Sequence, residues 1–313
     1  MKKLLFILLI GFPFFLQAQS ITEFPVLIGA YLGQPPPGDT PVVFAPGIVS
    51  DSLQQHGAPS FSPDGSVVFW QSNRELKNDK GEWLSNSMTM RRIGETWTKP
   101  EVSPYSSMPF FSPDGQRIYF DNEKNGLCVV EKQGSSWSEP KSVHLVSRYP
   151  ELKQAFYPSI ARNGTIYFMG YAEGMRNNFG IYRAELINGE YAKPELLPAS
   201  INTPGGMRNW APFIAPDESY LIFCSTRGLT RYDQGDLFVC FRQPDGRWTD
   251  PVNMGAPINT IQMERFSSLS PDGKYLFFTR DVLPDYYEDV YWVSAGIIEK
   301  LKTKAIKEGR LKQ

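Results

Sequence analysis

The sequence predicts an all-β fold, a five-bladed β-propeller of four-stranded blades whose ring is closed by the N-terminal strand. The first observation is a recurring turn. Ser-Pro-Asp-Gly stands at residues 62–65, 112–115 and 270–273, and degenerate copies stand at 161–164 and 215–218. The second is its spacing, because the Asp position falls at 64, 114, 163, 217 and 272, in steps of 50, 49, 54 and 55 residues. The third is that each repeat contains short β-type segments, up to four of them, as a propeller blade does.

The residue types of the turn explain its geometry, as in Pro271-Asp272-Gly273. Proline presets φ for a turn, aspartate can accept a hydrogen bond from the backbone ahead of it, and glycine tolerates a positive φ. The apolar run that follows predicts a buried strand. We therefore expect the Asp and Gly of these turns to have a structural role.

Each repeat can be divided into strands in the same way. An inner strand such as residues 58–61 enters the turn, and a second such as 67–71 leaves it. A third is clearest at residues 235–241, and a fourth begins near a proline, as at 251–254. In four repeats an aromatic residue precedes that proline by three positions: Trp97 and Pro100, Trp137 and Pro140, Tyr191 and Pro194, Trp248 and Pro251. We expect these rings to fill the gaps between blades, with each proline on an edge strand.

The fifth repeat contains three strands, at residues 266–269, 274–279 and 288–293, and lacks a fourth. Residues 40–44 have the form of a fourth strand. Because an open ring would expose unpaired backbone edges, we expect residues 41–44 to pair with the strand that contains Tyr291. After Ala295, apolar residues at helical spacing predict a short amphipathic helix on the outside of the ring, formed around Ile297, Ile298, Leu301 and Ala305.

The first residues have the pattern of a secretory signal peptide. Lys2 and Lys3 precede an apolar run from Leu4 to Leu16, and Ala18 offers a cleavage point. A transmembrane anchor would need about 20 apolar residues, which is longer than this run. We expect residues 1–18 to be removed and the protein to be exported, to the periplasm or outside the cell, with no transmembrane segment. An irregular lead at 19–40, a single propeller domain at 41–295 and a helix with a tail at 296–313 complete the expected organisation, as a monomer.

Composition excludes some partners and predicts free thiols. Loss of Lys2 and Lys3 leaves 30 basic residues against 33 acidic ones, a net charge of −3, which does not favour nucleic-acid binding. The cysteines are Cys128, Cys224 and Cys240. If the strands around the last two pair so that Ser225 lies near Asp236, Cys240 faces about Leu221 and is too far from Cys224 for a disulfide. We therefore expect three free, buried thiols, no metal site and no cofactor.

The Ser-Pro-Asp-Gly turn followed by an aromatic strand resembles the propeller repeat of the periplasmic TolB protein and its WD-like relatives. The resemblance covers residues 41–293, and the segment from Gly246 to Thr260 is similar to exported propellers of that group. It implies the fold. TolB itself has six blades and an additional N-terminal domain, whereas five repeats are counted in this sequence, so its partner-binding role transfers only as an analogy.

The strand order places the long connections on one face and the repeated turns on the other, and binding residues concentrate in long loops on a rigid scaffold. Eight residues before each turn Asp stand His56, Ser106, Ala155, Asn209 and Glu264, and seven before it stand Gly57, Ser107, Phe156, Trp210 and Arg265. We expect these ten to surround the mouth of a central channel. The alternative is a water-filled channel with satisfied polar groups, and His56 in particular is expected to be a hydrogen-bonded channel residue.

The candidate ligand-binding residues are His56, Phe156, Asn209, Trp210, Arg227, Glu264, Arg265 and Arg280. Arg227 and Arg280 follow second strands and could bind a carboxylate, or could pair with Glu264 and Asp281. This set predicts a binding or scaffold protein for a glycan, a peptide or an envelope protein. The alternative is a glycan-active hydrolase, which needs two carboxylates; Glu264 is the only acidic residue at the aligned positions, with Asp121 as a possible second. No catalytic residue is assigned.

Overall fold

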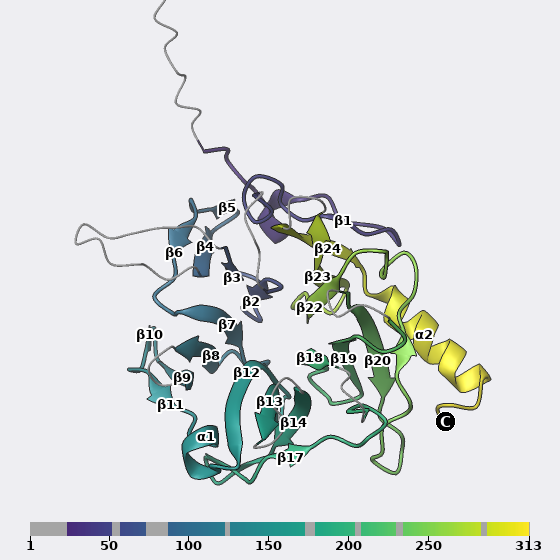
Figure 1. The fold of residues 1–313 in the computed structure, drawn as a ribbon. Coiled ribbons are helices and arrows are strands. Elements are labelled where there is room, and N and C mark those ends of the chain that lie inside the picture. Colours follow the sequence, from purple (N-terminus) through teal and green to yellow (C-terminus); the bar gives the residue numbers. More distant parts are fainter. Residues whose placement is uncertain are drawn as a thin grey trace, which may run out of the picture.

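The computed structural model describes residues 24–51, 57–72, 87–122, 126–172, 179–203, 208–229, 234–282 and 287–312 of the chain. These residues form five antiparallel sheets arranged in a ring, with the inner strands β2, β7, β12, β18 and β22 nearest the axis (Figure 1). The predicted five-bladed β-propeller is therefore confirmed. Within the described ranges, no helix is both long and apolar enough to cross a membrane.

Each blade has four strands, and the last strand of blade 5 comes from the N-terminal segment. From the inside outward, the strands are β2 (Ser60–Phe61), β3 (Val67–Gln71), β4 (Ser87–Ile93) and β6 (Glu101–Val102) in blade 1; β7 (Ser107–Phe111), β8 (Arg117–Asn122), β9 (Gly126–Gln133) and β11 (Lys141–Ser142) in blade 2; β12 (Leu152–Ile160), β13 (Ile166–Ala172), β14 (Gly180–Ala184) and β17 (Glu195–Leu196) in blade 3; β18 (Asn209–Ile214), β19 (Tyr220–Ser225), β20 (Asp236–Phe241) and β21 (Val252–Asn253) in blade 4; β22 (Glu264–Leu269), β23 (Tyr275–Val282), β24 (Tyr287–Ser294) and β1 (Val42–Val43) in blade 5.

Short elements complete the molecule. The third strands of blades 1 and 2 continue into hairpins with β5 (Thr96–Trp97) and β10 (Ser136–Trp137), and blade 3 has a separate hairpin of β15 (Leu186–Ile187) and β16 (Glu190–Tyr191). The helical elements are η1 (Tyr31–Gly33), α1 (Leu145–Arg148) and α2 (Gly296–Lys307). Helix α2 lies outside the ring beside blades 4 and 5, as expected from its apolar spacing (Figure 1).

The repeated turn is held by its serine as well as by its aspartate and glycine. In blade 1 the Ser62 hydroxyl donates to Asp64 Oδ1 at 2.5 Å and accepts from the backbone N–H of Val67 at 2.9 Å. Gly65 has φ of 67°, a conformation that a side chain disfavours. The hydrogen bond from Ser62 also lowers the pKa of Asp64. The serine contacts recur in blades 2 and 5, so the motif ties the turn to the start of the second strand.

The two degenerate turns, in blades 3 and 4, are neighbours and compensate for each other. Glu218 replaces the turn glycine of blade 4 and has φ of 59°. Its carboxylate accepts from Asn163 Nδ2 at 3.0 Å and from the Tyr167 hydroxyl at 2.6 Å, both in blade 3, and pairs with Arg242 at 3.3 Å. The loss of the motif glycine therefore accompanies a link between two blades.

Ring closure occurs where the sequence predicts it. Val43 pairs with Tyr291 and Val42 with Trp292 in antiparallel register, and Phe44 N–H donates to Val290 O at 2.8 Å. The Ser50 hydroxyl then accepts from Val290 N–H at 3.0 Å. The N-terminal segment is thus the fourth strand of blade 5, as expected.

A second contact holds the same junction, and the sequence did not indicate it. Trp97 of blade 1 donates its backbone N–H to Leu27 O at 3.0 Å and its indole N–H to Gly29 O at 2.7 Å. Tyr31 then lies between Phe61 of blade 1 and Tyr275 of blade 5, with ring centroids 5.6 and 5.3 Å away. Residues 27–31 therefore connect the first blade to the last.

Two of the predicted aromatic residues, Tyr191 and Trp248, contact a neighbouring blade. The Tyr191 hydroxyl of blade 3 is 2.9 Å from the Tyr119 hydroxyl of blade 2, and Trp248 of blade 4 packs edge-on against Tyr167 of blade 3. The cysteine predictions are also confirmed: Cys240 faces Leu221, and all three thiols are free and buried.

Candidate functional site

The inner strands share a backbone irregularity that shapes the centre of the ring. In blades 2–5 the pairing with the second strand shifts register near the strand start. The residue six positions before the turn Asp position has a left-handed backbone in each of these blades: Met108 (φ 53°), Tyr157 (φ 51°), Ala211 (φ 51°) and Phe266 (φ 48°). Such residues are uncommon and tend to cluster at functional sites.

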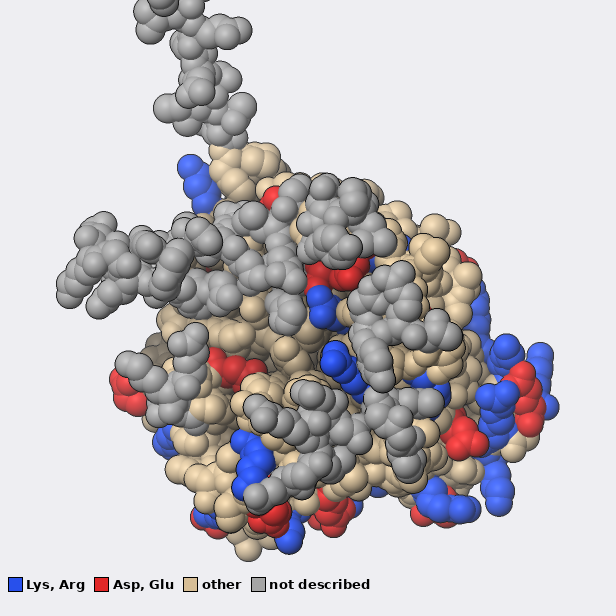
Figure 2. Space-filling view, viewed as in Figure 1, with Lys and Arg blue, Asp and Glu red and all other residues tan. Residues whose placement is uncertain are grey.

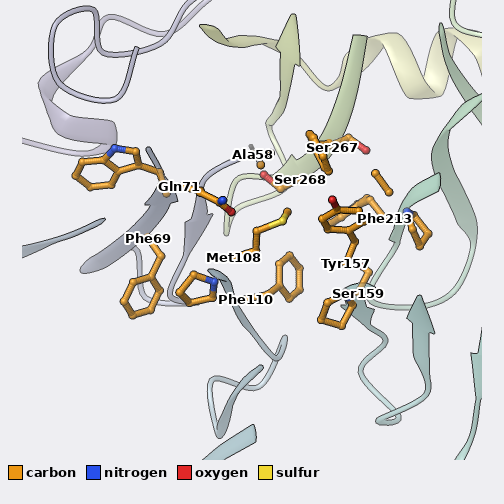
Figure 3. Close-up of a pocket in the computed structure, with 17 residues that line it drawn as sticks. Ala58, Phe69, Gln71, Met108, Phe110, Tyr157, Ser159, Phe213, Ser267 and Ser268 are labelled. Carbon is orange, nitrogen blue, oxygen red and sulfur yellow. The ribbon is translucent and has the colours of Figure 1, made fainter. Parts of the chain in front are cut away.

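These residues line a hollow on the axis, to which the inner strands of blades 2–5 contribute together with Gly57, Ala58 and strand β3 of blade 1 (Figure 3). Its walls are mostly rings, prolines and the Met108 side chain, whereas Gln71 brings an amide group (Figure 3). The hollow measures about 550 Å³ with its open part, but water-sized molecules can reach only about 50 Å³ of it. A cavity needs at least about 10–15 Å³ of such volume to hold a single water, so the centre has room for only a few waters and is a constriction.

The lining differs from the aligned set that the sequence predicted around the channel mouth. Of the nine of those residues that the structure describes, only Gly57 lines the hollow, and the other lining positions near the axis lie four to six residues before the turn Asp position. A sequence signal for this position existed. Proline stands five residues before the turn residue in four repeats, at Pro59, Pro109, Pro158 and Pro212. Pro109, Pro158 and Pro212 line the hollow from the innermost strand of their blades, an edge strand on which no N–H is needed.

The predicted residues Glu264 and Arg280 form a buried ion pair. Arg280 Nε donates to Glu264 Oε1 at 2.8 Å, and its guanidinium also donates to the backbone oxygens of Pro257 and Ile258 at 3.1 and 2.7 Å. Glu264 is 0% exposed and also accepts from the Thr260 hydroxyl at 2.6 Å. Both side chains therefore hold the connection between blades 4 and 5. Arg280 pairs with a carboxylate of the protein, which was the alternative to binding a ligand carboxylate.

Arg227 and Asn209 have internal partners as well. Arg227 donates to Ser200 O at 3.0 Å, Ile201 O at 2.8 Å and Thr203 Oγ1 at 2.6 Å, so it fastens the connection between blades 3 and 4. Asn209 is 1% exposed and accepts from the Ser225 hydroxyl at 2.8 Å. Neither of the two pairings considered for Arg227, with a ligand carboxylate or a protein carboxylate, is needed to explain its position.

Besides Arg227, three of the candidate ligand-binding residues are partly exposed. Phe156, Trp210 and Arg265 stand seven positions before the turn residue in blades 3, 4 and 5, and each is partly exposed. Their neighbours one position earlier, Ala155, Asn209 and Glu264, are buried. Since successive side chains of a strand point to opposite sides, the two aligned positions have different environments.

Each accessible side chain is held in place by neighbours. Arg265 pairs with Glu288 and lies 3.8 Å from Asp281, and its guanidinium lies over the Phe266 ring at 5.2 Å. Trp210 packs against Gly235, where an added Cβ would come within 3.0 Å of the indole. Positively and negatively charged side chains occur together near the middle of this face (Figure 2). His56, and most of the long connections predicted on this face, lie outside the described residues.

Asp121 is a titratable group next to the hollow. It stands on β8 opposite Ser107, and its carboxylate accepts from the backbone N–H of Tyr157, a lining residue. Burial raises the pKa of Asp121 to about 7, far above the usual value near 4. In the part of the chain that the structure describes, no three His, Cys, Asp or Glu side chains are grouped so that they could hold a metal ion.

Comparison with known proteins supplies no identity. No family model matches the chain, and no curated protein matches it. Similar solved structures include a gluconolactonase from Xanthomonas campestris (12% identity, 86% of this chain and 97% of that one, TM-score 0.48) and a thermostable family-43 glycoside hydrolase (14%, 77% and 90%, TM-score 0.47). A puromycin-hydrolysing peptidase of Mycobacterium tuberculosis is also similar (16%, 83% and 39%, TM-score 0.42), and this chain spans about two fifths of its length. Their activities differ, and similarity at this level carries no argument about function.

Proposed function

We propose that the protein is an exported binding protein that recognises a glycan across the mouth of the propeller, on the face of the long connections. One observation carries the proposal: Phe156, Trp210 and Arg265 stand at the same aligned position of three consecutive blades and are partly exposed there. The five-bladed ring fixes their relative positions.

The chemistry of these side chains suits a sugar. The face of a pyranose ring is apolar enough to pack on an aromatic ring, and its hydroxyls need directional partners. Trp210 and Phe156 would supply the rings. Arg265, fixed by Asp281 and Glu288, would supply donors, and the partly exposed Asp281 carboxylate would supply acceptors.

The size of the hollow favours a ligand that binds at the mouth. The roughly 50 Å³ that water-sized molecules can reach is far too small for a pyranose ring, so a glycan would lie across the opening and not along the axis. A peptide or an envelope protein could also use an aromatic and charged surface, and these are alternative outcomes of the experiment below.

A glycan-active hydrolase is the second candidate, and Asp121 is the observation that favours it. A carboxyl group that keeps its proton near neutral pH is suited to general-acid catalysis. Hydrolysis needs a second carboxylate across the scissile bond, and Glu264 is not available because it is buried against Arg280. Binding therefore remains the first proposal.

The first experiment is a binding screen of the purified protein on glycan and peptide arrays, followed by titration calorimetry with each hit. Trp210→Ala should weaken glycan binding by roughly thirtyfold, since truncating a central aromatic side chain costs about 2 kcal/mol. Asp114→Ala, in a turn on the opposite face, is the control and should lower stability but leave the affinity of the folded protein unchanged.

Three results would change the proposal. Hits confined to peptides would replace the glycan. Normal binding by Trp210→Ala together with lost binding by folded Asp114→Ala would move the site to the opposite face. Release of shorter oligosaccharides by the wild type, abolished in Asp121→Asn, would establish the hydrolase.

A further inference from the structure

The hollow below the mouth has properties that the proposed glycan site does not use. Its lining includes the rings of Phe110, Tyr157 and Phe266 together with prolines from blades 2, 3 and 4. Proline has no N–H, so these stretches of the wall present little polar backbone. Two of the serines there are already bonded between blades: Ser159 Oγ accepts from Ile214 N–H at 2.9 Å, and Ser268 Oγ donates to Pro59 O at 2.7 Å.

A polar group enters this apolar space from one side. Gln71 is 6% exposed, and its amide end reaches toward Met108 (Figure 3). Its Oε1 accepts from the Ser107 hydroxyl at 3.2 Å, which orients the amide. The amide nitrogen is a donor that a small acceptor could use. The space thus combines apolar walls with a directional donor.

The size of the space limits what can enter. The 50 Å³ reached by water-sized molecules leaves room for only a few waters, or for a group of about three or four heavy atoms. Gly57, one of the mouth positions, also lines the hollow, so the two spaces are adjacent.

One wall can adapt. The Met108 side chain lies among the rings (Figure 3), and an added Cβ at Gly57 would come within 2.8 Å of its Cε. Methionine is unbranched and changes its shape easily, so Met108 could move to fit an inserted group. The four left-handed residues hold the rest of the wall in one backbone conformation.

We infer that the hollow is a subsite for a small methyl-ended substituent of the ligand, such as an acetamido group. The methyl group would occupy the apolar walls, and a carbonyl oxygen would accept from the Gln71 amide. This rests on the proposed function in that the substituent is carried by a glycan bound at the mouth. A 6-deoxy sugar could offer the same methyl chemistry without the carbonyl.

The first test does not require the glycan. Acetamide is added to the full-length protein, and saturation transfer to its methyl protons is measured by NMR. We expect transfer to the wild type and its loss in Ala58→Leu, which places a larger side chain in the hollow. Butyramide should show weaker transfer than acetamide in the wild type and stronger transfer in Met108→Ala, where the space is larger. The Met108 variant keeps the test valid if Ala58→Leu fails to fold.

Absence of transfer in the wild type, or equal transfer in the wild type and a folded Ala58→Leu, would overturn the subsite. The second test compares an N-acetylglucosamine trimer, its free-amine form and a trimer of a 6-deoxy sugar. Burial of the substituent should give one of the methyl-bearing trimers about five- to tenfold tighter binding than the free amine. Equal binding would refute this inference while leaving the glycan site intact. Acetamide binding without any glycan binding would refute the proposed function while leaving the subsite.

Discussion

Removal of the Glu264 carboxylate should destabilise the whole propeller. Glu264 has no exposed surface, and Arg280, its partner at 2.8 Å, is 9% exposed. Glu264→Ala would leave the Arg280 guanidinium buried without a carboxylate partner, bonded to two backbone oxygens and packed over the rings of Phe278 and Tyr291. It would also deprive the Thr260 hydroxyl and backbone N–H of their acceptor.

The cost follows from this loss of partners. Breaking a buried ion pair by removing one side typically lowers the free energy of unfolding by about 3–5 kcal/mol, because the remaining charge is not compensated. For a chain of this size, about 4 kcal/mol corresponds to a fall of roughly 10 °C in Tm. The Glu264→Leu/Arg280→Met double variant should recover most of that loss, because it leaves no buried charge.

The assay is thermal and denaturant unfolding followed by circular dichroism. Glu131→Gln is the matched control, since it breaks the ion pairs of Glu131 with Lys141 and Arg117, whose side chains are 42%, 62% and 32% exposed, respectively. Exposed pairs contribute about 0–1 kcal/mol, so this variant should unfold near the wild-type temperature. A loss below 1 kcal/mol for Glu264→Ala, or a double variant less stable than the single one, would refute the argument that the pair is an internal support.

Three further predictions concern closure, thiols and pH. Deleting residues 24–45 should lower Tm for the whole domain, because it opens the ring at an edge strand; an unchanged Tm would contradict this. Cys128, Cys224 and Cys240, each at most 1% exposed, should react with a thiol reagent only after denaturation, as mass spectrometry would show. Because burial raises the pKa of Asp121 to about 7, the folded protein binds more protons than the unfolded chain between about pH 4 and pH 7, so this group's contribution to stability falls as pH rises through that interval. Asp121→Asn should remove this decline in chemical unfolding measured from pH 4 to 8, and identical pH profiles would argue against a buried carboxyl.

The features that the sequence predicted correctly are those set by local chemistry and by repetition. The spacing of the turn residue predicted the number of blades. The absence of a fourth strand in the fifth repeat predicted that the segment containing Val43 pairs with the third strand of that repeat. The register that separates Cys240 from Cys224 followed from the length of the connection between two strands. These inferences needed only the period of a strand and the types of turn residue.

The candidate site was less predictable, because aligning the repeats shows which residues occupy equivalent positions but not which way each side chain points. Glu264 and Arg265 are adjacent in the sequence, yet Glu264 is fully buried in an ion pair and Arg265 is partly exposed. The bulge that gives Met108 its left-handed backbone has no glycine to mark it, so the lining of the hollow could not be located from turn chemistry. Arg227 could not be assigned to backbone oxygens, since carbonyl partners have no side-chain signature.

The junction between the first and last blades affects the order in which the chain can fold. Val290 bonds to Ser50, which lies 240 residues earlier in the chain. During synthesis, the segment that completes blade 5 is therefore made early and has no partner until almost the entire chain exists. Contacts between such distant segments slow folding, and the waiting edge can pair with other chains. Any machinery that handles this protein before its C-terminal residues are available must therefore handle an open ring.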